Sequence, residues 1–294
     1  MRYSCIVFLC ALLPQLGKAS SNDSIPFVSL SAATIAVSEG GMGAHYQIDS
    51  LVSVAMPYAS VGEQLSMGSV VNLRTYGAPG TLISGLAGGL TPDHLMVLWQ
   101  GVPLNSPSLG MTDLSALPAR FFSSIKFNDG VSKSPHPAGA SGVLSLQNSR
   151  NNETAVHAGF TFNQFMNLRS GAGFNIPAGK CFLDASMQWE QLANDFSYED
   201  PYKHGAPTEV RQHNDFSRRA IRLGFYTPAQ RKIEGEVHAW VQNSVLQLPE
   251  PLGSYGSSLA TQRDSSVRLV GQLSSLDSRL TLQSVLWSQW ESNP

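Results

Sequence analysis

Acidic side chains cluster in one polar stretch of the sequence, where carboxylate oxygens are candidate ligands for Ca²⁺. The four acids are Asp195, Glu199, Asp200 and Asp215. Because no ligand spacing recurs among them, we expect a solvated polar loop rather than a calcium site. His204 and His213 lie in the same stretch, but they are too loosely spaced to predict a metal centre.

One candidate motif for nucleophilic catalysis is the Ser-x-x-Lys sequence from Ser123 to Lys126. This motif lies at the start of an expected strand and lacks the companion motifs of a Ser–Lys enzyme. The stretch from Gly85 to Gly89 has neither the residue order nor the following helix of a phosphate-binding loop. The sequence therefore predicts a protein that is not an enzyme, with no cofactor and no bound metal.

The composition favours a β-rich protein. The 294 residues are 42% hydrophobic and only 14% charged, with a formal net charge of -2. Nucleic-acid binding needs a clustered excess of Lys and Arg, so nucleic acid is excluded as an expected partner. Low charge combined with many Gly, Ser, Thr and aromatic residues is more typical of strands than of helices.

The first 19 residues have the pattern of a secretory signal peptide. Arg2 provides a positive start, residues 5–13 form a short apolar run, and the small residues Gly17 and Ala19 precede a plausible cleavage point. A buried N-terminal helix is one alternative. A lipoprotein acylated at Cys10 is another, although that cysteine lies inside the apolar run. We therefore expect residues 1–19 to be removed during export.

Membrane entry by a helix is not expected from the remaining sequence. Removal of residues 1–19 would leave Cys181 as the single cysteine, so neither an intrachain disulfide nor a cysteine-based zinc site is expected. No later stretch supplies about 18 consecutive apolar residues. Such a chain enters a membrane only as a β-barrel, in which the backbone polar groups are paired.

The mature chain divides near Arg150. Residues 20–49 form a polar tail with one short β-type run, Thr34, Ile35, Ala36, Val37 and Ser38. This run either pairs with the sheet edge of a partner or is an ordinary edge strand. Residues 50–149 alternate short segments with turns, which is typical of a small α/β domain. The expected strands are Val70–Thr75, Leu95–Trp99, Ser124–Phe127 and Gly139–Leu146, with a helical turn over Asp113–Phe122.

Residues 150–294 alternate apolar and polar side chains with a period of two. From 181 to 189 the odd positions are apolar and the even positions mainly polar, and residues 232–242 repeat the arrangement. This predicts the first strands of an antiparallel transmembrane barrel with a wet lumen. A soluble β-sandwich also alternates. Aromatic residues near the strand ends favour the barrel; they are Trp189, Trp240, Trp287 and Trp290.

The segment from 70 to 146 carries the most specific motifs. Residues 97–107 read VLWQGVPLNSP, and Asp113-Leu114-Ser115 is followed by Leu117-Pro118. The small residues Gly139, Ser141 and Gly142 close the segment. The sequence resembles the plug domain of TonB-dependent outer-membrane receptors, in particular the vitamin B12 receptor-like branch. The resemblance continues more weakly into 194–198 and 248–264.

The resemblance implies an α/β plug domain at 50–149 followed by an incomplete antiparallel transmembrane β-barrel at 150–294. The expected location is the cell outer membrane, in contact with outer-membrane lipid, and the expected function is active uptake of a cobalamin-like compound or a ferric siderophore. The energising partner would be TonB, which would grip the 34–38 run. An exported β-sandwich binding or adhesion protein is the alternative.

The resemblance also places substrate contacts on two plug loops. The first loop comprises Tyr76, Gly77, Ala78 and Pro79, and the second comprises Asn105, Ser106, Pro107 and Ser108. For any single residue of these loops a purely structural turn is the favoured interpretation, because both loops are rich in Gly and Pro.

Two positions depart from the pattern of this family. Ser84 and Asp129 occupy positions where the family commonly has arginines that hold the plug against the barrel wall. The residues after 150 also supply fewer strands than a plugged barrel of about 22 strands requires. We therefore expect a truncated barrel in which the plug is not held by those arginines.

Overall fold

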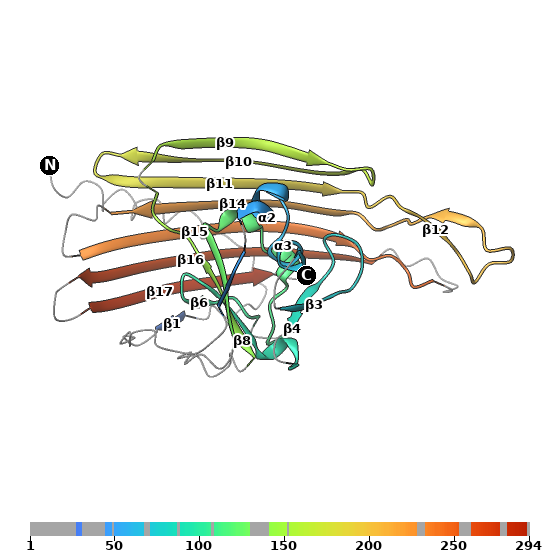
Figure 1. Ribbon diagram of the computed structural model, residues 1–294, viewed down its shortest axis with the longest axis horizontal. Coiled ribbons are helices and arrows are strands. Elements are labelled where there is room, and N and C mark those ends of the chain that lie inside the picture. The colour runs from blue at the N-terminus through green and yellow to red at the C-terminus, as the bar shows by residue number, and fades with distance from the viewer. Residues whose placement is uncertain are drawn as a thin grey trace.

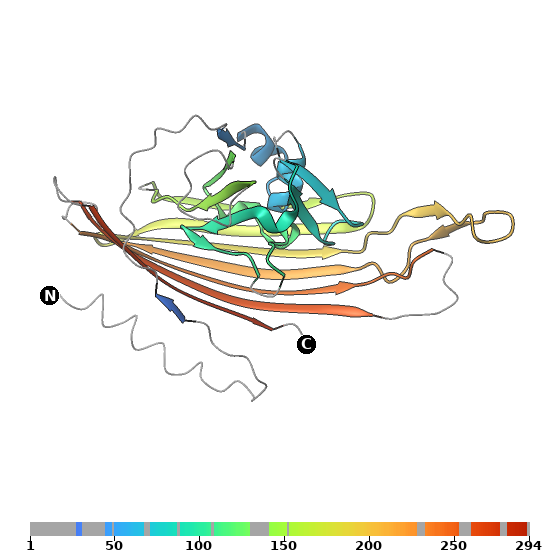
Figure 2. The same cartoon turned by 90° about the horizontal axis from the view of Figure 1, so that it is seen from below.

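A computed structural model describes most of the chain after residue 44. The described residues are 28–30, 45–48, 50–67, 71–86, 89–106, 109–129, 141–151, 153–227, 233–252, 260–276 and 281–292. They form a small unit, residues 45–148, which we call the globule, and one large sheet. The globule lies against one face of the large sheet (Figures 1 and 2). The expected signal peptide and the 34–38 run lie outside the described residues.

The large sheet is an antiparallel meander with the strand order β1-β17-β16-β15-β14-β11-β10-β9. Its strands are β1 (Val28–Leu30), β9 (Ala155–Phe162), β10 (Asn167–Ala178), β11 (Cys181–Leu192), β14 (Phe216–Tyr226), β15 (Ile233–Gln247), β16 (Thr261–Leu276) and β17 (Thr281–Ser292). From β9 onward, strands adjacent in the sheet follow one another along the chain, as expected for barrel strands joined by hairpins. Part of the expected tail, β1, pairs with β17.

The two ends of the large sheet differ in the length of their connections. At one end the strands are joined by a short turn at 179–180 and by short connections over 227–232 and 277–280. At the other end the connection 163–166 is also short, but 193–215 and 248–260 are long, and the former of these contains a projecting hairpin of β12 (Ser197–Glu199) and β13 (Thr208–Val210). Short turns on one side and longer loops on the other are typical of outer-membrane barrels, where the longer loops are extracellular.

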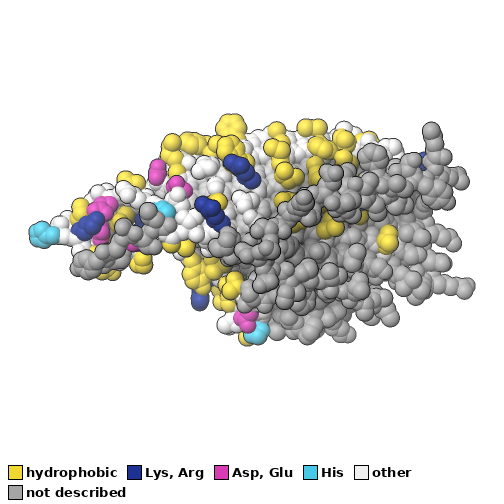
Figure 3. Space-filling view, turned by 180° about the vertical axis from the view of Figure 1, so that it is seen from behind, with side chains coloured by type: hydrophobic (Ala, Val, Ile, Leu, Met, Phe, Trp, Pro, Cys, Tyr) yellow, Lys and Arg dark blue, Asp and Glu magenta, His cyan; other side chains and the backbone are white. Residues whose placement is uncertain are grey.

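Burial along β14 alternates residue by residue. Arg218 and Arg222 are buried toward the globule, whereas Ile221 and Leu223 are 54% and 47% exposed on the opposite face. The register extends this pattern across the sheet, so that one face is polar and covered by the globule and the other is mainly apolar. On the face opposite the globule, Figure 3 shows hydrophobic side chains over the part that is not drawn in grey. The predicted alternation is therefore present, with the polar face turned inward.

The globule is built on a five-stranded sheet with the order β2-β7-β8-β5-β6. Its strands are β2 (His45–Gln47), β5 (Leu95–Trp99), β6 (Val102–Pro103), β7 (Ser124–Asp129) and β8 (Gly142–Gln147). β5 and β8 are parallel, and a separate hairpin joins β3 (Asn72–Thr75) to β4 (Ile83–Leu86). The helical pieces are α2 (Ser50–Ala55), α3 (Val61–Ser66), η2 (Pro92–His94), η3 (Leu114–Ala116) and η4 (Ala119–Phe121).

The two helices α2 and α3 differ from the sequence prediction, which places only short strands and turns over residues 50–66. The sequence does carry a start signal for α3. Ser60 accepts a hydrogen bond from the backbone N–H of Glu63, whose carboxylate accepts one from the N–H of Ser60. This reciprocal capping box satisfies two backbone donors that the first helical turn leaves unpaired. No helix among the described residues is long and apolar enough to cross a membrane.

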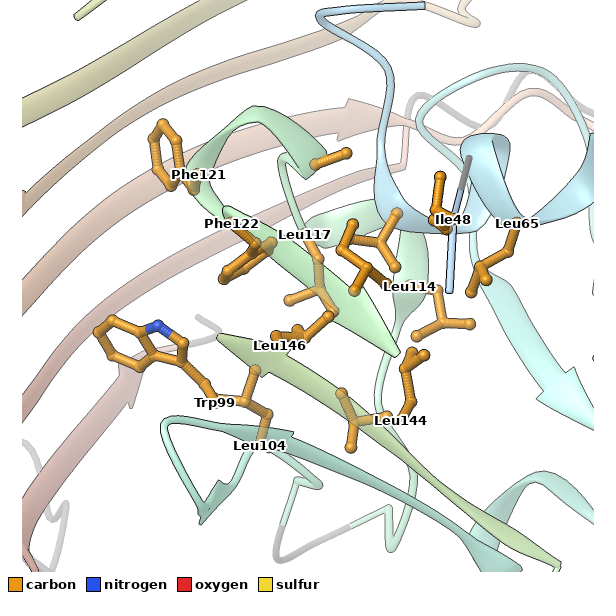
Figure 4. Packing of buried hydrophobic residues seen from close by; sticks show 14 of the residues in the cluster. Ile48, Leu65, Trp99, Leu104, Leu114, Leu117, Phe121, Phe122, Leu144 and Leu146 are labelled. Carbon is orange, nitrogen blue, oxygen red and sulfur yellow. The ribbon is translucent and has the colours of Figure 1, made fainter. Parts of the chain in front are cut away.

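The hydrophobic core lies between the globule's sheet, its helices and the large sheet (Figure 4). Leu114, Leu144 and Leu146 are fully buried within it, and Trp99 points from the end of β5 toward the large sheet. Ala220, Trp240 and Val270 of the large sheet belong to the same cluster. The core therefore continues from the globule into the large sheet, and the two parts pack as one body.

Candidate functional site: the interface between the globule and the large sheet

Tyr58, in the loop between α2 and α3, fills a notch in the large sheet. Gly159 of β9 and Gly171 of β10 are cross-strand neighbours and form the floor of this notch. A Cβ on Gly171 would lie 2.6 Å from a ring carbon of Tyr58, which is closer than side-chain atoms pack. The Tyr58 hydroxyl donates to the Gly171 carbonyl (3.3 Å), and Gln188 donates to the Tyr58 carbonyl (2.8 Å).

A chain of charged groups continues from this notch along the inward face. Glu63 of α3 pairs with Arg169 of β10 (2.6 Å), and Arg169 faces Glu190 of β11 (3.4 Å). Glu190 accepts from Nε of Arg218 on β14 (2.9 Å), and Arg218 in turn donates to the carbonyl of Ser115 (2.5 Å). Two carboxylates and two guanidinium groups therefore alternate along this chain of contacts, Glu63 coming from the globule and the other three from the sheet. Glu190 and Arg218 are each 1% exposed, so their charges depend on each other rather than on water.

The ionisation of Glu63 depends on this contact. Burial by itself raises the pKa of the Glu63 carboxyl, but the charge of Arg169 and its hydrogen bonds outweigh burial and bring the pKa below its usual range. Arg169 thus holds Glu63 ionised at the edge of the interface. The pair joins α3 directly to the wall strand β10.

Asp113 anchors the other segment that Arg218 contacts. Its carboxylate accepts from the backbone N–H of Ile83 (3.0 Å) and from the N–H and hydroxyl of Ser115 (2.9 Å each). Burial raises the pKa of Asp113 above its ordinary value, despite these hydrogen bonds. Asp113 therefore links β4 to η3, and the carbonyls of η3 are presented to the sheet. Gln242 of β15 donates to the second of them, the Ala116 carbonyl (3.0 Å).

Trp240 does not lie in an aromatic belt at the membrane boundary, so the expectation from the sequence is wrong for this residue. Its side chain is fully buried and faces the globule. Its ring packs edge-to-face against Trp99 (5.4 Å between centroids), Phe121 (5.8 Å) and Phe122 (5.8 Å). Position 240 is even in a strand whose odd residues face outward, so its direction follows from the alternation. Trp189 is 44% exposed on the outward face, whereas the side chains of β17 lie outside the described residues.

Gln100 completes the interface beside Trp99. Its amide donates to the Asn148 carbonyl (3.2 Å) and lies 2.9 Å from Nε2 of His238 and 3.2 Å from Glu236 on β15. Gln272 of β16 donates to its carbonyl. Gln100 has a φ of +50°, which is uncommon for a residue other than glycine. The strained backbone turns the chain sharply after β5. The side-chain amide of Gln100 therefore reaches β15 and the residue that follows β8, and its backbone carbonyl reaches β16.

The first predicted ligand loop lies between β3 and β4 and touches the large sheet. Tyr76 is 56% exposed and Gly77 is also exposed, whereas Ala78 is half-buried. The Pro79 carbonyl accepts from Asn194 (3.0 Å), a buried residue in the connection after β11. The tip of the β3–β4 hairpin points toward the end of the sheet that carries β12 (Figures 1 and 2). The loop is therefore held to the large sheet through Pro79, while Tyr76 is left accessible.

The second predicted ligand loop is held by Asn105. The Asn105 side chain accepts from the N–H of Val97 (2.9 Å) and donates to the carbonyls of Leu95 and Gly110 (2.9 Å each). Both N–H groups of this amide are thus used inside the loop. Ser106 is half-buried, and Pro107 and Ser108 lie outside the described residues.

The other residues singled out from the sequence do not gather into a site. Asp200 accepts from the N–H of Tyr202 (3.0 Å) and faces Lys203 (3.7 Å), and one His213 nitrogen lies 2.8 Å from the Ala260 carbonyl. No group of three His, Cys, Asp or Glu side chains able to hold a metal ion occurs among the described residues. The Ser123 hydroxyl lies 3.0 Å from that of Ser149.

The two positions that depart from the expected family pattern contribute no charge to the described part of the interface. Ser84 is buried at 1% exposure in β4. The side chain of Asp129 lies outside the described residues. The charged contacts instead use Glu63 from the globule and Arg169 and Arg218 from the sheet. The family pattern predicts that arginines of the plug hold it against the wall. Here the large sheet supplies the arginines, and they reach the globule.

Sequence reasoning missed the residues that join the globule to the sheet. A Ser60-x-x-Glu63 capping box was visible, and it would have placed Glu63 on a helix. The alternation also indicated that Glu190 and Arg218 share the polar face of their strands. Which globule residue meets each of them has no sequence signal, because these contacts join positions more than a hundred residues apart.

Comparison with known proteins places this arrangement in a fold class. No known family pattern matches the sequence, and no curated protein matches it. The solved structures do match. The iron transporter FrpB from Neisseria meningitidis superposes with a TM-score of 0.67 at 8% identity, over 87% of this chain and 42% of that one. The chain has the fold of an outer-membrane receptor.

Further matches are of the same kind. The alcaligin outer-membrane receptor FauA from Bordetella pertussis gives a TM-score of 0.63 at 12% identity, covering 87% of this chain and 40% of its own. The ferric enterobactin receptor PfeA from Pseudomonas aeruginosa gives 0.59 at 12% identity, over 87% and 41%. The chain thus spans less than half the length of these structures. At such identities the likeness shows the fold alone.

Proposed function

We propose that this chain is the plug and the first wall strands of a TonB-dependent outer-membrane receptor that takes up a scarce nutrient. The observation that carries the proposal is the opposite character of the two faces of the large sheet. The polar face is covered by the globule, which contacts it through the Glu63–Arg169 ion pair and buried hydrogen bonds, and the exposed face is mainly apolar. A soluble β-sandwich would expose a polar face instead.

The interface would act as the holding contact of the plug. An open barrel lumen would leak, so a plug must stay seated until it is moved by work done on it. The contacts of Tyr58, Glu63 and the η3 carbonyls with β9–β11, β14 and β15 are of this kind. They are specific, buried and electrostatically balanced. A contact of this type is rigid at rest, yet it can be exchanged for water when the plug shifts.

A pull on the N-terminal segment would reach these contacts in chain order. The 34–38 run precedes β2, which pairs with β7, and α2 and α3 follow directly. Among the interface contacts described above, those of Tyr58 and Glu63 come earliest along the chain. TonB would add its own strand to the 34–38 run, and main-chain hydrogen bonds would carry the force.

The ligand would bind at the end of the sheet with the long connections. The exposed Tyr76–Pro79 loop and the 105–108 loop are the proposed contacts within the globule. Solved structures of similar fold include an iron transporter, an alcaligin receptor and a ferric enterobactin receptor. We therefore place a ferric siderophore before a cobalamin-like compound as the nutrient. Asn105 would shape the second loop rather than touch the ligand, because its amide is occupied.

The proposal is tested by the response of TonB binding to proline. Val37→Pro removes one backbone donor from the 34–38 run, and Asn22→Pro makes the same change outside it. A crosslink between the TonB C-terminal domain and the outer-membrane form of the chain should be lost with Val37→Pro and kept with Asn22→Pro. Equal crosslinking of both variants would contradict the assignment of the TonB-binding segment.

Membrane extraction separates the receptor from a soluble exported binding protein. Carbonate or urea washing should leave the chain in the outer-membrane fraction, because the apolar face would contact lipid. A β-sandwich of the same chain would be released into the wash. Release by either agent would rule out the receptor proposal in favour of that alternative.

A further inference from the structure

The outward face of the large sheet carries two charged side chains among its described residues. Alternation and register place Arg219 of β14 and Arg263 of β16 on this face, and both are exposed. Every Asp and Glu side chain of the described strand positions of β9–β11 and β14–β16 falls on the inward face. The two arginines therefore lie on an otherwise uncharged surface with no acidic residue beside them in the described strands.

Neither arginine has a partner in the part of the chain that the structure describes. The described residues offer Arg219 and Arg263 no hydrogen bond and no ion pair, whereas Arg169, Arg218 and Arg222 on the inward face are all paired. An unpaired guanidinium is costly against hydrocarbon, and charged groups on the lipid face become tolerable only near the membrane boundary. Its five N–H donors match the oxygens of phosphate in bidentate fashion.

Both arginines lie at the end of the sheet with the long connections. Arg219 is three residues after the start of β14 and Arg263 two residues after the start of β16. Figure 3 shows basic side chains among hydrophobic ones on this face, near the end from which the β12–β13 hairpin projects. They are two strands and two residues apart, which corresponds to about 12 Å between their backbones. Two long side chains can approach one headgroup across that span.

The residues around them suit a membrane boundary. Trp189 of β11 is the direct cross-strand neighbour of Arg219 and is 44% exposed. Asn243 of β15 is its neighbour on the other side, followed by Ser265 of β16 in the same row. Below this row, toward the short turns, the outward positions of β14 are Ile221, Leu223 and Phe225. One row across the strands thus contains an aromatic residue, an arginine and two polar residues. It borders the apolar band on the side of the long connections, as an interfacial girdle does.

We infer that Arg219 and Arg263, with Trp189 and Asn243, form a binding site for a lipid whose headgroup carries an anionic phosphate. The lipid would lie in the leaflet at the end of the long connections, with its acyl chains along the apolar band and its phosphate between the two guanidinium groups. The inference rests on the membrane insertion proposed above. It adds a defined lipid partner that neither the nutrient site nor the TonB contact requires.

The test uses the full chain in phosphatidylcholine nanodiscs, with lipid retention measured by native mass spectrometry. The added probes are dioleoyl phosphatidic acid, dioleoyl glycerol without phosphate, and inorganic phosphate. The chain should retain phosphatidic acid in preference to dioleoyl glycerol. Arg219→Gln and Arg263→Gln should each weaken retention about fivefold, and the double variant about thirtyfold. Lys180→Gln, at the short-turn end of the same sheet, should retain the lipid like the unchanged chain.

Three results would overturn the site. Equal retention of phosphatidic acid and dioleoyl glycerol would show that acyl chains alone bind. Displacement of the lipid by millimolar inorganic phosphate would show a general anion site. An unchanged affinity of the double variant would show that the arginines take no part. Resistance to carbonate extraction identifies variants that have inserted, so a failure of lipid binding in inserted chain leaves the receptor proposal intact, whereas a chain that does not insert contradicts the receptor proposal itself.

Discussion

The inward and outward faces of the large sheet use the same strands for opposite purposes. On the inward face Glu190, Arg218 and Arg222 are almost completely buried and each has an ionic partner. At outward positions of the same strands, Ile221 and Met187 are 54% and 55% exposed. Charges therefore lie on the face that the globule covers, where they pair with one another, and apolar side chains lie where nothing in the described chain covers them.

On the large sheet the usual relation between burial and polarity is thus reversed. In a soluble protein, charged residues are rarely buried and large exposed apolar patches are limited to a few hundred Å². Here a wide exposed face is apolar and the protected face is charged. The inward face should therefore be sensitive to single substitutions that leave a charge or a cavity, and the outward face should tolerate apolar exchange.

The largest expected loss on the inward face comes from Trp240→Ala. The ring is fully buried between Trp99, Phe121 and Phe122, so its removal leaves a cavity at the centre of the interface. We expect a loss of about 3–5 kcal/mol in the free energy of unfolding. Urea unfolding in detergent micelles, followed by near-ultraviolet circular dichroism, measures it. The matched change on the outward face, Trp189→Ala, should cost much less. Equal losses would mean that the two faces are not different environments.

Glu190→Gln should cost about 3 kcal/mol, at the lower end of the range for a broken buried ion pair. The variant keeps the side-chain volume but leaves Arg218 without its carboxylate, while Arg169 retains Glu63. The free energy of unfolding under the same conditions reports the loss. Gln191→Leu, the next residue and outward-facing, is the control and should change stability by less than about 0.5 kcal/mol. A loss below about 1 kcal/mol for Glu190→Gln would mean that the charge chain is solvated.

Gly171→Ala tests the notch for Tyr58 and should cost about 1–3 kcal/mol. The added Cβ would meet the Tyr58 ring at 2.6 Å and the Met187 carbonyl oxygen at 3.0 Å. A double-mutant cycle with Tyr58→Ala separates the two contacts, because the second change removes the ring. The two substitutions should be clearly less than additive. Additive losses would place the strain at the Met187 backbone and remove Tyr58 from the holding contact.

Several elements followed directly from the sequence. β5 has the predicted bounds, Leu95–Trp99, because a short apolar run ends at a Gly–Val–Pro turn. The period-two pattern assigned the outward positions of β11 correctly, since alternation in a strand is a property of the backbone. The helical turn expected over Asp113–Phe122 is present as the short helices η3 and η4.

The contacts between distant segments did not follow from the sequence. Alternation places Trp240 and Val241 on opposite faces of β15, but it does not tell which face the globule covers, so the sequence prediction put Trp240 in the wrong environment. α2 and α3 are only six residues long, too short for a helical period to stand out. The notch for Tyr58 depends on two glycines of the large sheet. A glycine in the sequence does not indicate which side chain will pack against it.

The smallest expected effect concerns pH and separates two acids of the globule. The folded pKa of Glu63 is lowered by Arg169, so its contribution to stability is present above the ordinary glutamate pKa and is lost as pH falls through the lowered value. The folded pKa of Asp113 is raised by burial, so its contribution has the opposite sign and is lost as pH rises through the raised value. Glu63→Gln should therefore lose about 1–2 kcal/mol at neutral pH and show a smaller decrease on acidification. Unfolding measured at neutral and acidic pH tests this, with the exposed Glu153→Gln as the control. An unchanged acid response in Glu63→Gln would mean that the pair with Arg169 is open in solution, and the holding contact would then begin at Glu190 and Arg218.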